Sequence, residues 1–164
     1  KNHGFDVLVL EDSQKKRAQR MEIGDRVLFY VSDICMFVAT ATVNSEVVQN
    51  SVEELDTLAN ETEDQLMYPW RVDLKKAVLL RDSEFIDARL IAPRLQYIRK
   101  WTPEHWPLAF QGALHLIPKE DFQLLEAEMR KHKKTPSIHM RDQIGGHCAI
   151  YTYRQSTQES RHVS

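Results

Sequence analysis

The chain carries the sequence GDRVLFYVSDICMFVATATV at residues 24–43, and this stretch decides the fold class. A glycine and an aspartate form a turn signal, and residues 26–31 then give a β-branched and aromatic run typical of a buried strand. The polar pair Ser32-Asp33 separates this run from a second one at residues 36–43. Because so short a connection favours a hairpin, the stretch predicts two antiparallel strands.

A third strand is expected at residues 68–80, where apolar and charged side chains alternate from Trp70 to Lys75. Its Pro69 cannot donate a ladder hydrogen bond, so this residue should lie at the beginning of the strand or at an edge. Residues 44–65, which precede it, are acidic and polar and predict a loop with one helical turn. Asp87 is a candidate N-cap for a helix that Pro93 interrupts.

The carboxyl half predicts a short strand at residues 113–117 and a helix that begins near Pro118. The buried stripe of this helix should be Phe122, Leu125 and Met129. Residues 148–153 give one extra strand. Strands and helices in this order, joined by hairpins rather than crossovers, predict an α+β fold built on a mixed, mostly antiparallel β-barrel with flanking helices.

Composition excludes several classes of protein. The 164 residues fit one domain, and no apolar run approaches the roughly 20 residues of a membrane span. The amino end lacks the apolar core of a signal peptide, so we expect a cytoplasmic location and no membrane partner. A formal net charge of −2 is unlike that of sequence-independent DNA binders, which carry a basic excess. Binding of nucleic acid would therefore depend on a local patch or a base pocket.

Motifs of catalysis are missing from the sequence, which has no phosphate-binding glycine loop and no nucleophile elbow. Glu104 and His105 are adjacent in a loop, so their side chains point in different directions. We expect no catalytic residue, no cofactor and no metal site, and hence no enzyme. The spacing of the residues that invite a metal site matches no zinc pattern: His132, His139, His147 and Cys148.

Aromatic residues in the loop at residues 101–112 are the strongest functional signal. Trp106 and Phe110 lie beside two prolines and next to Gln111, which has both a donor and an acceptor. A flat base needs stacking faces and a few edge-reading hydrogen bonds, and this loop offers both. The alternative is that these rings cover a core, as we expect for Phe29, Phe37 and Phe122.

Four segments in this order resemble the EVE domain family: residues 20–30, residues 37–43, residues 68–72, and residues 110–112 followed by 117–122. The resemblance covers roughly residues 3–130. It implies a PUA-like fold, related to the YTH readers of methylated adenine, and binding of a modified base in DNA or RNA through an aromatic cage.

Carried over by position, the resemblance implies two sets of site residues. A patch that binds the nucleic-acid backbone falls on Lys15, Lys16 and Arg17. Arg71 faces either the mouth of the base pocket or the surface of its strand. The remaining pocket candidates are Tyr30, Ser32, Trp106, Phe110 and Gln111.

Relatives in this family open with an aromatic-containing strand ahead of the segment that matches residues 3–5. We therefore interpret residues 1–134 as an EVE-like domain that lacks its first strand, and residues 135–164 as a polar C-terminal extension. Either the chain is truncated or residues 149–153 fill the gap.

The leading hypothesis is a non-catalytic reader of modified bases, and the alternative is a small-ligand or protein-interaction module on the same barrel. A third hypothesis, a nuclease or base-modifying enzyme, has support only from Glu104, His105 and His115. The sequence does not distinguish DNA from RNA, nor does it give the base modification or the oligomeric state.

Overall fold

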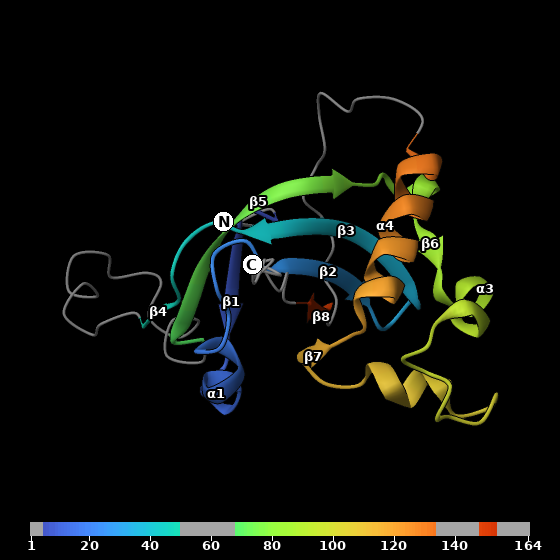
Figure 1. Ribbon diagram of the computed structural model, residues 1–164, viewed down its shortest axis with the longest axis horizontal. Helices are drawn as coiled ribbons and strands as arrows, with labels where there is room; N and C mark the ends of the chain where they lie inside the picture. The colour runs from blue at the N-terminus through green and yellow to red at the C-terminus, as the bar shows by residue number, and fades with distance from the viewer. Residues whose placement is uncertain (1–4, 50–67, 134–147, 154–164) are drawn as a thin grey trace, which may run out of the picture.

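The computed structural model describes residues 5–49, 68–133 and 148–153, which form a mixed α+β structure around one curved sheet (Figure 1). Six strands follow one another in the order β1-β5-β3-β2-β8-β7, while β4 pairs with β5 and β6 with β3. All pairs are antiparallel except β7 with β8. The strands are β1 (Val7–Leu10), β2 (Arg26–Val31), β3 (Met36–Val43), β4 (Val48–Gln49), β5 (Trp70–Leu79), β6 (Ile86–Asp87), β7 (Leu114–Leu116) and β8 (Cys148–Tyr153).

Short helices connect the strands, and one longer helix covers the sheet. The α-helices are α1 (Lys15–Ala18), α3 (Ala88–Ile91) and α4 (Lys119–His132). The 3-10 helices are η1 (Asp12–Gln14), η3 (Asp82–Glu84), η4 (Ala92–Arg94) and η5 (Trp106–Phe110). Asp87 caps α3 as predicted, because its carboxylate accepts a hydrogen bond from the backbone N–H of Arg89. Pro93 lies in η4, where the α-helical conformation has ended.

The predicted hairpin is confirmed: β2 and β3 pair from Arg26 opposite Thr42 to Val31 opposite Met36. Both faces of β2 are buried. Leu28 and Tyr30 pack into one hydrophobic cluster, whereas Val27 and Phe29 pack into another. The hairpin therefore lies between two cores.

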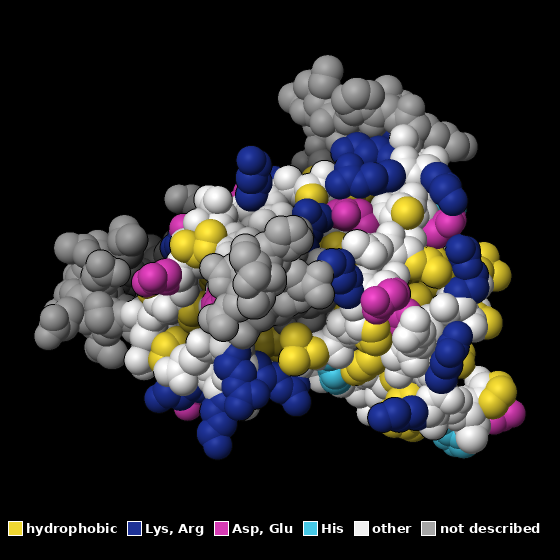
Figure 2. Space-filling view, in the orientation of Figure 1, with side chains coloured by type: hydrophobic (Ala, Val, Ile, Leu, Met, Phe, Trp, Pro, Cys, Tyr) yellow, Lys and Arg dark blue, Asp and Glu magenta, His cyan; other side chains and the backbone are white. Residues whose placement is uncertain are grey.

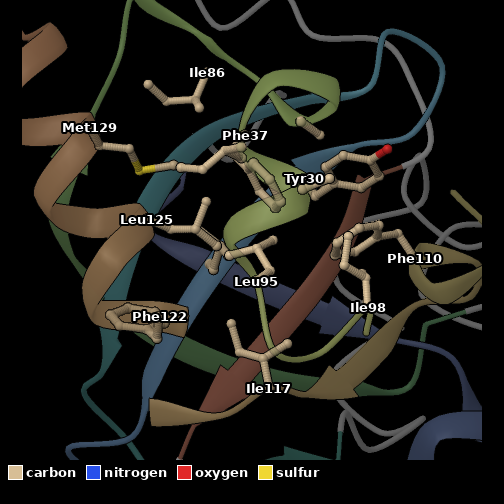
Figure 3. Packing of buried hydrophobic residues seen from close by; sticks show 14 of the residues in the cluster. Tyr30, Phe37, Ile86, Leu95, Ile98, Phe110, Ile117, Phe122, Leu125 and Met129 are labelled. Atoms are coloured by element: carbon tan, nitrogen blue, oxygen red, sulfur yellow. The ribbon is translucent and has the colours of Figure 1, made fainter. Parts of the chain in front are cut away.

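The first core lies between the sheet and α4, which crosses one face of it (Figure 1). The predicted stripe of Phe122, Leu125 and Met129 is buried there, and Figure 3 shows Leu125 and Met129 directed toward Phe37. Two polar contacts fix the helix. Glu126 forms an ion pair with Arg26 of β2 and accepts a hydrogen bond from the Thr40 hydroxyl at 2.8 Å.

The second core lies on the other face, where β1 and α1 pack against β2, β3 and β5. Strand β1 is not among the sequence predictions, although its four consecutive apolar residues are a strand signal. The indole N–H of Trp70 donates to the Asp12 carboxylate at 3.2 Å, and the ammonium group of Lys15 lies 5.4 Å from the centre of the Trp70 ring. These contacts hold α1 beside β5.

The closed barrel is not confirmed, because the strand path ends at β1 and β7 and no pairing within the described ranges joins these two strands. Register shifts at Phe29/Tyr30 and at Thr40/Ala41 mark irregularities of the kind that bend a sheet. The predicted strand at residues 148–153 is present as β8, between β2 and β7. Of the predicted loop with a helical turn, residues 48–49 form β4 and residues 50–67 lie outside the described ranges. No helix among the described residues has the length and apolar character needed to cross a membrane.

Candidate functional site

A surface hollow opens between α1 and β7, with a volume of about 510 Å³. We call it the α1 cavity. This volume lies within the range of ordinary ligand pockets. Its lining combines cations, one carboxylate and two rings, and includes Arg17, Arg20, Asp25, Tyr97, Leu114 and His115.

Arginine side chains of α1 and the residues just after it form the cationic rim of the cavity. The guanidinium of Arg17 donates to the carbonyl oxygen of Leu114, and this bond joins α1 to β7 across the cavity. The predicted backbone-binding residues, Lys15, Lys16 and Arg17, all lie on α1 and are exposed. Figure 2 shows a concentration of Lys and Arg side chains at the position of α1, so this basic patch borders the cavity.

The inner wall is formed by Tyr97 and His115. The phenol oxygen of Tyr97 lies 3.0 Å from Nδ1 of His115 and 3.2 Å from the carbonyl oxygen of Ala109. Burial lowers the pKa of His115 below its ordinary value, and the Arg17 cation lowers it further, while hydrogen bonds at the backbone of Gln111 and Gly112 oppose the shift. Burial also raises the pKa of Tyr97. Both rings are therefore neutral at pH 7 beside a cationic rim.

A carboxylate of α4 positions this wall. Asp121 is only 2% exposed, and its two oxygens accept from the backbone N–H groups of Gln96 and Tyr97 at 2.9 and 2.7 Å. These bonds tie residues 96–97 to the first turn of α4, which itself packs on the sheet. The position of the Tyr97 ring in the α1 cavity thus depends on a helix that lines no part of it.

The structure puts Tyr30 and Phe110 in the first core. Tyr30 is 1% and Phe110 is 3% exposed, and their ring centroids lie 4.9 Å apart, with Phe37 against both (Figure 3). Burial strongly raises the pKa of Tyr30, and a hydrogen bond to the Cys35 side chain raises it further. These two rings present no accessible face to a ligand in this structure.

Trp106 lines the second hollow, a groove of about 320 Å³. Its ring meets Phe110 edge-on with centroids 5.9 Å apart, and it is half-buried. We call this hollow the tryptophan groove. Its lining includes Pro93, Leu95, Ile98, Arg99, Trp101 and Trp106.

The other predicted pocket residues lie elsewhere. Ser32 is half-buried in the β2–β3 turn, where its carbonyl accepts from the Cys35 N–H at 3.2 Å. Gln111 is exposed, and it lines neither the α1 cavity nor the tryptophan groove. Arg71 is exposed on β5 and lies 3.3 Å from the Asp73 carboxylate. The predicted set is thus distributed over a core, a groove, a turn and a strand surface.

Residues proposed for catalysis are also separate. Glu104 and His105 lie exposed in the loop before η5, where His105 Nδ1 is 2.7 Å from the Thr102 hydroxyl, whereas His115 lines the α1 cavity. Among the described residues, no three His, Cys, Asp or Glu side chains are grouped as metal ligands. His139 and His147 lie outside the described ranges.

Sequence reasoning missed Tyr97, Asp25 and Arg20 as site residues. Arg20 follows Arg17 by three residues, which puts both on one side of a helical turn and was a usable signal. No local pattern marks Tyr97, because its contact with His115 joins residues 18 positions apart. The α1 cavity forms where α1, the residues just after it, β7 and Tyr97 meet.

An open cavity of cations and aromatic rings beside a curved sheet is a candidate ligand site. Comparison with protein families then gives the relationship of the protein: a sequence model of the EVE domain matches residues 3–127 of the 164-residue chain. The protein belongs to the EVE domain family, and the resemblance found in the sequence is confirmed. A search of curated proteins gave no match.

Proposed function

We propose that this protein binds nucleic acid without catalysis and receives a single modified base in the α1 cavity. The observation that carries the proposal is the composition of that cavity: two arginines at its rim and two neutral rings at its wall, in a volume of about 510 Å³. An unstacked base needs a pocket with aromatic faces and edge-reading polar groups. Its phosphates need cations beside that pocket.

The rim suits phosphate. A guanidinium has five N–H donors in a fixed fork, and such forks bind phosphate oxygens in pairs. The bond from Arg17 to the Leu114 carbonyl holds the fork at the mouth of the cavity and leaves further N–H groups for a ligand. Because the chain carries a net charge of −2, affinity would come from this local patch rather than from the whole surface.

The lining of the cavity suits a base. Tyr97 and His115 offer ring faces, and Met21 and Leu114 offer apolar contact for a methyl group on the base. The Asp25 carboxylate also lines the cavity, and one of its oxygens accepts from the Glu22 N–H at 2.9 Å. The proposal therefore moves the predicted pocket from the Tyr30 and Phe110 rings to the α1 cavity. It retains the predicted backbone patch at residues 15–17.

A titration tests the proposal. Single-stranded DNA and RNA dodecamers of one sequence, each with an unmodified, a methylated or a hydroxymethylated base at one position, are measured at two salt concentrations. We expect one modified strand to bind more tightly than its unmodified partner, with affinity falling as salt rises. Equal, millimolar-level binding of all strands would overturn the proposal.

Two arginine variants test where on the protein the nucleic acid binds. Arg17→Ala should weaken binding about tenfold or more, because it removes charge-assisted hydrogen bonds to phosphate. Arg71→Ala, on an exposed strand surface away from both hollows, is the matched control and should bind as the wild type does. The reverse order of effects would put the nucleic acid on β5 instead. Melting temperatures of both variants show whether the loss of the Leu114 contact affects folding.

A second candidate is a small-ligand module that uses the same cavity. The combination of Arg17, Tyr97 and His115 also fits a free anionic ring compound, such as a nucleotide. Mass spectrometry of the purified protein would detect such a ligand. A co-purified metabolite together with no salt-dependent affinity for any strand would favour this reading.

A further inference from the structure

Both tryptophans that line the tryptophan groove are accessible to solvent. Trp101 is 40% exposed, and Trp106 is half-buried. Pro93, Leu95 and Ile98 supply an apolar floor, and Arg99 lies at the lining. Exposed rings beside a cation are the combination on which single-stranded nucleic acids stack.

The groove and the α1 cavity share one segment of chain. Within residues 95–101, Tyr97 lines the α1 cavity, whereas Ile98, Arg99 and Trp101 line the groove. The two hollows are therefore formed by neighbouring residues of the same loop.

A chain of ring contacts limits the distance between the hollows. The centroids are 5.9 Å apart for Trp106 and Phe110, 5.8 Å for Phe110 and Tyr97, and 6.4 Å for Tyr97 and His115. Trp106 and His115 can therefore be no more than about 18 Å apart. Phe110 is 3% exposed, so this line runs through the core and a strand on the surface takes a longer path. A stacked single strand of twelve nucleotides, at about 3.4 Å per nucleotide, extends about 40 Å.

The charge of this segment favours a polyanion. Residues 94–111 contain three basic side chains, Arg94, Arg99 and Lys100, against one acidic side chain, Glu104. Arg94 has a carboxylate partner, since Glu128 lies 3.6 Å from it. Arg99 and Lys100 are exposed and form no ion pair with any residue in the described ranges.

We propose that the tryptophan groove is a second binding site for the same strand, at which a base flanking the one in the α1 cavity stacks on Trp101 and Trp106. Arg99 and Lys100 bind the phosphates between the two. The inference rests on the proposed function and extends it: the ligand is single-stranded over several nucleotides, because bases paired in a duplex cannot stack on protein rings.

Trp101→Ala tests the site. The probes are the single-stranded dodecamer that binds most tightly to the wild type and the 5′-mononucleotide of the base that it presents. Loss of one stacking contact should weaken dodecamer binding by about fivefold to 150-fold and leave mononucleotide binding unchanged. Trp101→Phe, which keeps an aromatic face, should restore most of the affinity. Leu90→Ala is the control, since Leu90 is 80% exposed and lines neither hollow.

Tryptophan fluorescence gives an independent readout. Trp70 is 5% exposed and outside the groove, and the ammonium group of Lys15 lies 5.4 Å from its ring, so the mononucleotide measures the contribution of Trp70 separately. The dodecamer should quench emission more in the wild type than in Trp101→Phe, where Trp106 is the tryptophan that remains in the groove, whereas the mononucleotide should quench neither tryptophan of the groove.

Equal dodecamer affinity of Trp101→Ala and the wild type would overturn the groove site and leave the α1 cavity proposal intact. Quenching by an acidic aromatic peptide but not by the dodecamer would identify a peptide groove, which also overturns the inference. Failure of every strand to bind the wild type would overturn both proposals.

Discussion

Phe110 and Trp106 are four residues apart on one 3-10 helix, yet they belong to different regions of the molecule. Phe110 is 3% exposed and contacts Tyr30, Phe37 and Tyr97 in the first core, whereas Trp106 lines a surface groove. The same contrast separates the buried Tyr30 from Tyr97 at the α1 cavity. An aromatic residue of this protein thus lies in a core or at a surface hollow according to which side of the backbone it faces. Residue type does not decide between them.

The largest effect that tests this contrast is expected from Phe110→Ala. Loss of a fully buried phenylalanine should lower the free energy of unfolding by about 3–5 kcal/mol, measured by urea denaturation. Binding per folded molecule should persist. Leu108→Ala is the control on the same 3-10 helix, and it should change stability little because Leu108 is 41% exposed. A stable Phe110→Ala variant that no longer binds nucleic acid would make Phe110 a pocket residue and remove the contrast.

A smaller effect is expected from Asp121→Ala. This change leaves the backbone N–H groups of Gln96 and Tyr97 without their acceptor, which should cost about 1–3 kcal/mol in the free energy of unfolding. It should also weaken base binding, because the Tyr97 wall loses its attachment to α4. Glu120→Ala, exposed in the same turn of α4, is the matched control. Weakened stability with unchanged affinity per folded molecule would mean that Tyr97 does not contribute to the site.

Much of the fold could be predicted because its signals are local. The β2–β3 hairpin, β5, β7, β8 and the buried stripe of α4 each follow from a period of two or of 3.6 within one segment. The strand path from β1 to β7 could not be predicted, because it depends on which distant segments pair. Nor could closure into a barrel be judged, since register shifts such as that at Phe29/Tyr30 are set by packing.

Of the α1 cavity, only a charged part has a local signal in the sequence. The predicted basic run at residues 15–17 is exposed on α1, and its Arg17 lines the α1 cavity. The rings were not predictable, because β2 is buried on both faces and alternation cannot say whether Tyr30 faces a ligand or a core. Tyr97 reaches the cavity through hydrogen bonds to Asp121, which is 24 residues away.

The smallest expected effect is on the pH dependence of stability. It tests the rings at a surface hollow, and in particular whether His115 in the wall of the α1 cavity is neutral. Burial and the Arg17 cation hold the pKa of His115 lower in the folded protein than in the unfolded chain, where it is about 6.5. Around and below that pH, the unfolded chain therefore binds more protons at this histidine than the folded protein does. Protonation of His115 favours unfolding, so the free energy of unfolding is not reduced by this group at pH 7.5 and declines as pH falls through about 6.5. His115→Gln does not titrate and should flatten the decline in the urea midpoint between pH 7.5 and pH 5. His132→Gln, at an exposed position near the end of α4, should keep the decline of the wild type. If the His115→Gln variant declined as steeply as the wild type, the imidazole would not be the neutral, desolvated group that the proposed base pocket requires.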